Sequence, residues 1–121
     1  MIKQLATKDI KSYLMAEPNS VLLDVRTKEE WETIGKPDGE KIGLKTYFLS
    51  LQFGNERIFN ENFIQEFKNL AINQDKNIMV ICRSGTRSQF VAELLNQKEN
   101  YTCINISDGF EGNQENVGWK R

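Results

Sequence analysis

The sequence predicts an α/β fold: a single parallel sheet of about five strands with helices on both faces, in one domain over residues 1–121. Short apolar runs rich in strand formers alternate with segments of helical periodicity, which is typical of parallel strands joined by right-handed crossovers. Residues 21–25 are apolar almost throughout, as expected for a central strand buried on both faces. The length of 121 residues suits one ordinary domain and is too short for two.

The first elements are a strand, a helix and a second strand. We expect a short strand over residues 2–5 and a helix that Thr7 caps and that ends before Pro18. The strand over residues 21–25 follows and contains Asp24. A buried carboxylate is costly unless it is paired or hydrogen-bonded, so Asp24 should have a dedicated partner. We favour a structural role for this residue over a catalytic one.

A short helix comes next. Thr27 and Glu30 have the spacing of a capping box, in which each side chain accepts a hydrogen bond from a free N–H at the start of a helix. Gly35 ends this helix. Arg26 is close enough in sequence to pair with Glu30, and we interpret that expected pair as architectural.

The middle of the chain is less regular. Residues 36–43 are polar and contain a proline and two glycines, which favours an irregular connection. We expect a strand over residues 45–51 and a loop over residues 52–59. A helix then begins at Asn60 or Asn62. Its apolar positions recur at about one-turn spacing and are Phe63, Phe67 and Leu70.

From residue 77 a strand, a tight loop and a helix follow in direct succession. The strand ends at Cys82, and the helix ends in a polar turn over residues 96–100. Residues 101–106 alternate into a last strand. The buried side of the helix is expected to consist of Phe90, Val91, Leu94 and Leu95.

Cys82 is the candidate catalytic residue, because the carboxyl end of a strand in a parallel sheet is where α/β proteins bind ligands. If residues 83–87 wrap around the sulfur, their N–H groups form an anion-binding nest, and the amino end of the next helix adds positive charge. Arg83 and Arg87 bring further positive charge, and such surroundings stabilise a nucleophilic thiolate. The residues expected to bind substrate are Arg83, Ser84, Gly85, Thr86, Arg87 and Ser88.

The second cysteine, Cys103, lies within the last predicted strand, away from arginine and glycine, and we interpret it as structural. Both thiols are expected to be reduced, because the chain does not look like a small secreted scaffold. The sequence contains no histidine, which excludes a Cys-His dyad, a Ser-His-Asp triad and any zinc site that needs imidazole. Activation of Cys82 therefore has to come from backbone and arginine electrostatics. The expected chemistry at Cys82 needs neither a cofactor nor a metal.

The charge is balanced, with 16 basic and 17 acidic residues and a net charge of -1. There is no overall field to attract nucleic acid or an anionic membrane. The sequence has no apolar run of membrane-spanning length and does not begin with a signal-peptide core. We expect a soluble, cytoplasmic protein that binds neither nucleic acid nor membrane.

Three stretches together resemble the single-domain rhodanese-like sulfurtransferase family. Cys82-Arg-Ser-Gly-Thr-Arg-Ser88 is similar to the family's active-site loop, in which a Cys carries a sulfane sulfur as a persulfide. The stretch from Val21 to Arg26, with Glu29-Glu30-Trp31, is similar to its amino-terminal signature, and Asp108-Gly-Phe-Glu-Gly112, with Trp119, to its carboxyl-terminal one. The resemblance extends from about Val21 to the end and implies the same α/β fold, and it also suggests the pair of Arg26 with Glu30.

The resemblance is weakest in the irregular segment. Most relatives have Gly-His-Ile-Pro-Gly-Ala here, whereas this sequence has Gly35-Lys-Pro-Asp-Gly39 and no histidine. Residues 36–43 look like a longer connection, so this wall of the pocket is expected to differ.

The predicted activity is transfer of a sulfane sulfur from a donor such as thiosulfate to a thiol or cyanide acceptor through a Cys82 persulfide. The acceptor thiol belongs to a small molecule or to a protein. A cysteine-dependent phosphatase is the nearest enzymatic alternative, but the spacing from Cys82 to Arg87 is one residue shorter than in tyrosine-phosphatase-type loops. The other alternative is a non-catalytic rhodanese-like module that binds a partner or senses redox state through Cys82.

Overall fold

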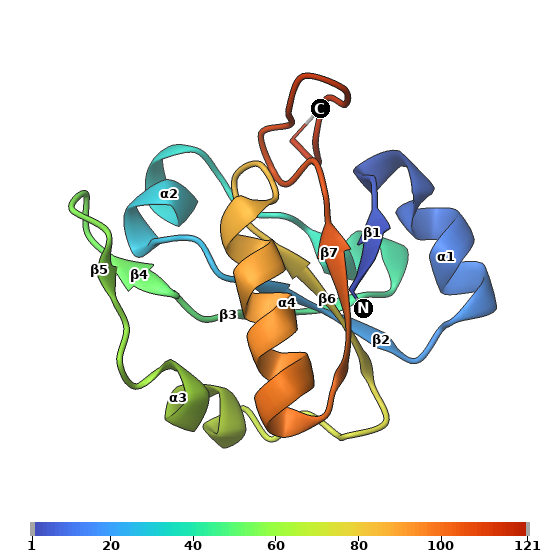
Figure 1. Cartoon of the computed structure of the whole chain (residues 1–121). Helices are drawn as coiled ribbons and strands as arrows, with labels where there is room; N and C mark the ends of the chain where they lie inside the picture. Colours follow the sequence, from blue (N-terminus) through green and yellow to red (C-terminus); the bar gives the residue numbers. More distant parts are fainter. Residues whose placement is uncertain (1, 121) are drawn as a thin grey trace.

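The computed structural model describes residues 2–120 and contains a five-stranded parallel sheet in the order β1-β7-β6-β2-β3 (Figure 1). This sheet and its helices confirm the predicted α/β class. The strands are β1 (Lys3–Leu5), β2 (Ser20–Asp24), β3 (Lys45–Phe48), β6 (Asn77–Ile81) and β7 (Thr102–Ile106).

The carboxyl ends of the central strands meet at one edge of the sheet. In the register of the sheet, Asp24 on β2 pairs with Ile81 on β6, and Val80 on β6 pairs with Asn105 on β7. All these strands are parallel, so the loops that leave them begin side by side. Cys82 directly follows β6 at this edge, where parallel sheets place their ligands.

Helices cover both faces of the sheet. Helices α3 (Phe63–Asn69) and α4 (Thr86–Glu99) pack on one face, and α1 (Ile10–Ala16) packs on the other (Figure 1). A short helix α2 (Lys28–Thr33) follows β2, and two 3-10 helices, η1 (Thr7–Asp9) and η2 (Gly39–Ile42), precede α1 and β3. No helix in residues 2–120 combines the length and the apolar character needed to cross a membrane.

Strand residues alternate between two hydrophobic cores. Leu23 and Val80 face the core that includes α3 and α4, whereas Leu22 and Met79 face the core that includes α1. This alternation follows from the two-residue period of a strand. Because β2 is buried along its whole length, the predicted central strand is confirmed.

The capping box is also confirmed. The Thr27 hydroxyl oxygen accepts a hydrogen bond from the Glu30 N–H at 3.2 Å, and Glu30 Oε1 accepts one from the Thr27 N–H at 3.1 Å. Glu30 is thereby fixed at the amino end of α2, only 8 % exposed.

The predicted role of Thr7 as the cap of α1 was wrong. Thr7 begins η1 instead, and its N–H and hydroxyl donate to Asp108 Oδ1 at 3.0 and 2.9 Å. Asp108 attracts both donors because it is almost fully buried and needs partners. Helix α1 ends at Ala16, before Pro18 as predicted.

The region predicted as a loop contains a small antiparallel hairpin formed by β4 (Gln52–Phe53) and β5 (Ile58–Phe59). Its turn is closed by a hydrogen bond from the Arg57 N–H to the Gly54 carbonyl at 3.2 Å. A Gly-Asn pair between short apolar segments is a hairpin signal, so the sequence did contain a clue to this element.

Helix α4 differs from the prediction at two points. It continues to Glu99, so residues 96–99 are helical, and Asn100, whose φ is +59°, is its C-cap. Phe90 is 51 % exposed rather than buried. Successive helical residues point about 100° apart, so burial of Val91 leaves Phe90 at the edge of the buried side.

Candidate active site

Cys82 is held at the start of the loop between β6 and α4. The N–H of Gly85 donates a hydrogen bond to Cys82 Sγ at 3.2 Å. Within residues 2–120 this is the one backbone N–H that binds the sulfur, so the predicted nest of amides is narrower than expected. Gly85 has a φ of +107°, and a Cβ atom there would clash with the Ser107 carbonyl oxygen. The loop therefore depends on glycine at this position.

A hydrogen-bond network fixes the hydroxyl of Ser88 beside the sulfur. Asn105 Nδ2 donates to the Gly85 carbonyl at 3.1 Å and to Gln4 Oε1 at 2.8 Å, so Asn105 Oδ1 is the acceptor for the Ser88 hydroxyl. Ser88 Oγ lies 3.2 Å from Cys82 Sγ. The hydrogen bond to Asn105 therefore fixes the position of the Ser88 hydroxyl beside the sulfur. Nothing in the local sequence around Asn105 indicates this role.

Arg87 reaches from α4 to Glu30 on α2. Its Nη1 and Nη2 donate to Glu30 Oε1 and Oε2 at 2.8 and 2.9 Å, a bidentate pair. The side chains of Arg87 and Glu30 are only 11 % and 10 % exposed. This pair connects the cysteine loop to the capping box of α2.

Burial and ion pairing have opposite effects on the pKa values of Glu30 and Arg87. Burial alone would raise the pKa of Glu30, but hydrogen bonds from Arg87 and Thr27 and the nearby positive charge lower it to about 2. Burial alone would lower the pKa of Arg87, but the hydrogen bonds and charge of Glu30 raise it above its ordinary value. Both groups therefore stay charged at neutral pH.

The predicted pair of Arg26 with Glu30 was wrong. Arg26 Nε and Nη2 bind the Asp24 carboxylate, with Nη2 and Oδ2 2.8 Å apart, and both side chains are 0 % exposed. Residues two apart in an extended chain point to the same side, which brings these two together, while Glu30 is already occupied by Arg87. The Arg26 guanidinium also lies 4.3 Å from the centre of the Phe110 ring. Asp24 thus has the dedicated partner that its burial predicted.

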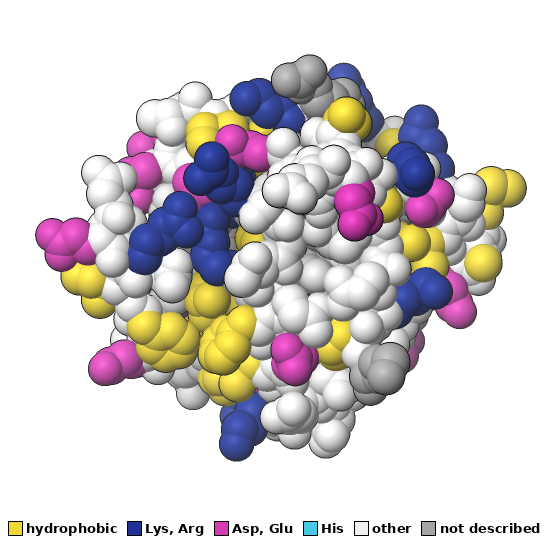
Figure 2. All heavy atoms as spheres, turned by 45° about the horizontal axis from the view of Figure 1, so that its top comes forward, with side chains coloured by type: hydrophobic (Ala, Val, Ile, Leu, Met, Phe, Trp, Pro, Cys, Tyr) yellow, Lys and Arg dark blue, Asp and Glu magenta, His cyan; other side chains and the backbone are white. Residues whose placement is uncertain are grey.

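The sulfur lies at the bottom of a pocket of about 360 Å³. Cys82 is only 1 % exposed, and Ser84, Thr86 and the arginines of its loop line the pocket around it. Gly85 and Ser88 contact the sulfur from inside the fold. Figure 2 shows Lys and Arg side chains gathered on this face of the molecule, beside exposed hydrophobic side chains.

Two further residues of the pocket were missed by sequence reasoning. Gln52 and Arg57 reach the pocket from the β4–β5 hairpin. Arg57 occupies the hairpin turn with a φ of +58°, and its Nη2 lies 3.9 Å from Glu30 Oε1. The pocket is therefore lined by three arginines, of which the sequence predicted two.

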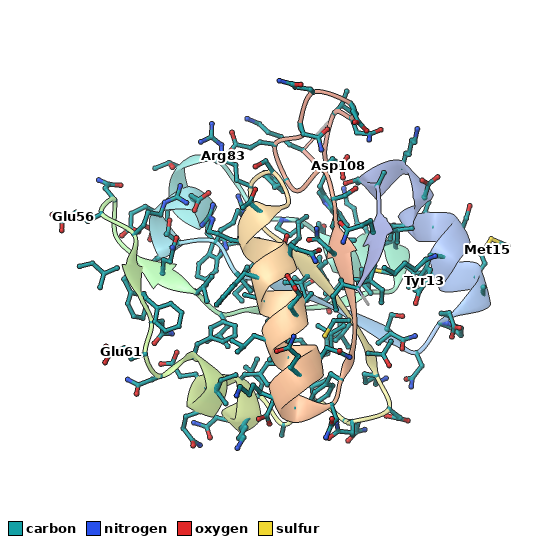
Figure 3. The ribbon with its side chains drawn as sticks, viewed as in Figure 1. Tyr13, Met15, Glu56, Glu61, Arg83 and Asp108 are labelled. Carbon is teal, nitrogen blue, oxygen red and sulfur yellow. The ribbon has the colours of Figure 1, made fainter. Side chains whose placement is uncertain are left out.

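Arg83 is the more exposed cation of the loop, with a side chain that is 59 % exposed. Figure 3 shows it beside the amino end of α4. Its Nε lies 3.2 Å from Glu111 Oε2. The backbone of the carboxyl-terminal segment holds the loop in place, because the Phe110 and Glu111 N–H groups donate to the Cys82 and Arg83 carbonyls at 2.8 and 2.9 Å.

Cys103 has none of these features. It is 4 % exposed and packs in the core beside α4, and burial raises the pKa of its thiol to about 12. A protonated, enclosed thiol is unreactive, which agrees with the structural role predicted for it.

The sequence matches a known protein family and several related proteins. Residues 7–116 match the family model described as the rhodanese-like domain. An uncharacterized protein of Rickettsia prowazekii is 37 % identical over 123 residues, an alignment that covers 100 % of this chain and 94 % of the relative.

Two solved structures have similar folds. The crystal structure of Rv0390 from M. tuberculosis has a TM-score of 0.82 and 27 % sequence identity, covering 98 % of this chain and 91 % of that one. A rhodanese-like domain protein from Staphylococcus aureus has a TM-score of 0.66 and 21 % identity, covering 99 % and 100 %, and that similarity concerns the fold alone.

Proposed function

Because the chain belongs to the rhodanese-like domain family, we propose that it is a sulfurtransferase that carries a sulfane sulfur on Cys82. The donor is thiosulfate or a similar anion, and the acceptor is a thiol or cyanide. One observation supports this proposal most: Cys82 Sγ accepts a hydrogen bond from the Gly85 amide at the bottom of a pocket lined by three arginines. This is an environment for a sulfur anion and for an anionic donor.

The proposed reaction has two displacement steps. The Cys82 thiolate attacks the sulfane sulfur of thiosulfate, the S–S bond of the donor breaks, and sulfite leaves with the bonding electrons. An acceptor thiolate or cyanide then attacks the outer sulfur of the persulfide, and the Cys82 thiolate leaves. No net oxidation or reduction of the protein occurs over the cycle, and both the starting thiolate and the persulfide intermediate at Cys82 are sulfur anions.

The residues around Cys82 have separate roles in this proposal. The Gly85 amide stabilises the thiolate, while Arg57 and Arg83, which are the more exposed cations, attract the donor. Arg87 shares its charge with Glu30, so it acts by shaping the pocket wall as well as by its charge.

The test is the intact mass of the purified protein after incubation with thiosulfate, before and after a reducing thiol. Wild type and the control variant Cys103→Ser should each gain one thiol-labile sulfur atom, and Cys82→Ser should gain none. Sulfur on Cys82→Ser, or a load that maps to Cys103, would refute the site. Loading that is followed by no turnover with cyanide would refute the enzyme and favour a redox sensor.

Two arginine variants test separately how pocket shape and positive charge contribute to sulfur transfer. Arg87→Lys keeps the charge but loses the fork that binds Glu30, so sulfur transfer should fall by at least about tenfold. Arg83→Ala should weaken thiosulfate binding at low salt, and this difference from wild type should shrink as salt screens the charge. Wild-type turnover in Arg87→Lys would show that only the diffuse field of Arg87 matters.

A further inference from the structure

A second, larger cavity of about 560 Å³ lies on the α1 side of the sheet. It is bordered by η1 and α1, by η2 and the segment before it, and by the carboxyl-terminal segment. Its lining shares no residue with the Cys82 pocket. The volume is within the range of about 300–1,000 Å³ that is usual for sites of small organic ligands.

The wall of this cavity is strongly basic. Five lysines line it, against one acidic residue, Asp38, in a chain whose net charge is only -1. The five are Lys8, Lys11, Lys36, Lys41 and Lys120. Within residues 2–120 none of them forms a salt bridge. Lys36 Nζ lies 5.5 Å from the centre of the Phe48 ring, but a ring does not neutralise its charge. Like charges around one cavity repel each other, and an anion with several charges would relieve this repulsion.

The floor of the cavity is apolar and includes two aromatic rings. It is formed by Ile10, Ile42, Phe110 and Trp119. Phe110 is 4 % exposed, and Trp119 is partly buried against the same core. An apolar floor under a cationic wall suits a ligand that has a flat ring at one end and negative charge at the other.

The buried carboxylate of Asp108, which Figure 3 shows just beyond β7, connects two sides of the cavity. Asp108 Oδ1 accepts hydrogen bonds from Thr7, on the η1 side, and Oδ2 accepts one from the Gly118 N–H at 3.0 Å. The Trp119 and Lys120 N–H groups donate to the Gly109 and Phe110 carbonyls at 3.0 and 2.9 Å. These hydrogen bonds fix the Phe110 and Trp119 part of the floor.

We propose that this cavity is a binding site for a small aromatic organic phosphate with at least two negative charges, of the nucleoside diphosphate type. The ring packs on Trp119 and the phosphates lie among the lysines. Lys36 and Lys41 come from residues 36–43, where the sequence departs from the rhodanese-like pattern, so that departure supplies part of the basic wall.

The test is isothermal titration calorimetry of the full chain with ADP. Adenosine, which lacks the phosphates, and tripolyphosphate, which lacks the ring, are titrated for comparison. ADP should bind one to one and at least tenfold more tightly than adenosine. The double variant Lys11→Gln/Lys41→Gln should have an affinity for ADP at least tenfold lower than wild type. The control Lys3→Gln/Lys98→Gln makes the same change of charge at exposed lysines elsewhere and should have the affinity of wild type. Thermal unfolding of all variants confirms that they are folded.

The contact between the ligand ring and Trp119 is tested by Trp119→Leu. This variant should bind ADP more weakly than wild type does, but should bind tripolyphosphate equally well. The proposal is overturned if wild type does not bind ADP, if the two double variants bind it equally, or if adenosine binds as well as ADP. Equal affinity of wild type for ADP and tripolyphosphate, with no effect of Trp119→Leu, would overturn the aromatic part of the site. None of these measurements depends on sulfur transfer.

Discussion

The ion pair between Arg87 and Glu30 makes a specific contribution to stability that Glu30→Gln removes. Glutamine keeps the size of the side chain and an oxygen that accepts from the Thr27 N–H. Its NH2 group replaces Oε2, which accepts from Arg87 Nη2, so the substitution deletes the charge and one hydrogen bond of the pair. Folding lowers the pKa of Glu30 from its ordinary value of 4.5 to about 2. At about 1.4 kcal/mol per pKa unit, that shift corresponds to about 3 kcal/mol of stability at neutral pH.

The pH dependence has a defined sign. The folded state favours the ionised carboxylate, so this stability is fully present well above pH 4.5 and is lost as the pH falls toward 2. About 1 kcal/mol should be lost by pH 4 and about 2 kcal/mol by pH 3. The difference between wild type and Glu30→Gln should shrink by the same amounts.

Urea unfolding followed by circular dichroism at pH 7, 4 and 3 measures these differences. Glu29→Gln is the matched control, because Glu29 is the adjacent carboxylate in the first turn of α2 and is exposed. It should cost less than about 1 kcal/mol. The argument is refuted if Glu30→Gln costs no more than Glu29→Gln at pH 7, or if the gap from wild type is unchanged at pH 3.

Three further predictions follow from the same structure. Gly85→Ala should abolish sulfur loading, because a Cβ atom at this position clashes with the Ser107 carbonyl oxygen and the loop must move. The intact mass of the variant after incubation with thiosulfate measures the loading, and a normal load would contradict the prediction. Asp24→Asn should lower the free energy of unfolding by about 3–5 kcal/mol by leaving Arg26 buried and unpaired, and Asp24→Asn/Arg26→Met should recover part of the loss in urea unfolding. Iodoacetamide at pH 8 should label Cys103 in the Cys82→Ser variant only as fast as the protein unfolds, since burial raises the pKa of Cys103 to about 12; rapid labelling of the folded variant would contradict this.

Features that depend on neighbouring residues could be predicted from the sequence. The apolar run at residues 21–25 indicated a strand buried on both faces, and Thr27 with Glu30 indicated a capping box, both confirmed. The run ending at Cys82, followed by a glycine-containing loop and helical spacing, indicated a cysteine at the carboxyl edge of a sheet. These patterns are local, because strand period, helix caps and tight turns are set by residues a few positions apart.

Only the tertiary structure decided which distant groups meet. Glu30 pairs with Arg87 across 57 positions of sequence, although Arg26 is much closer along the chain. The hairpin brings Arg57 to the cysteine pocket, Asn105 orients the Ser88 hydroxyl, and lysines from separate elements line one cavity. The sequence by itself thus determined most of the elements and located the candidate cysteine loop at the end of β6. The partners of each charged group depended on how those elements pack, because a side chain binds the nearest available group in space and not along the chain.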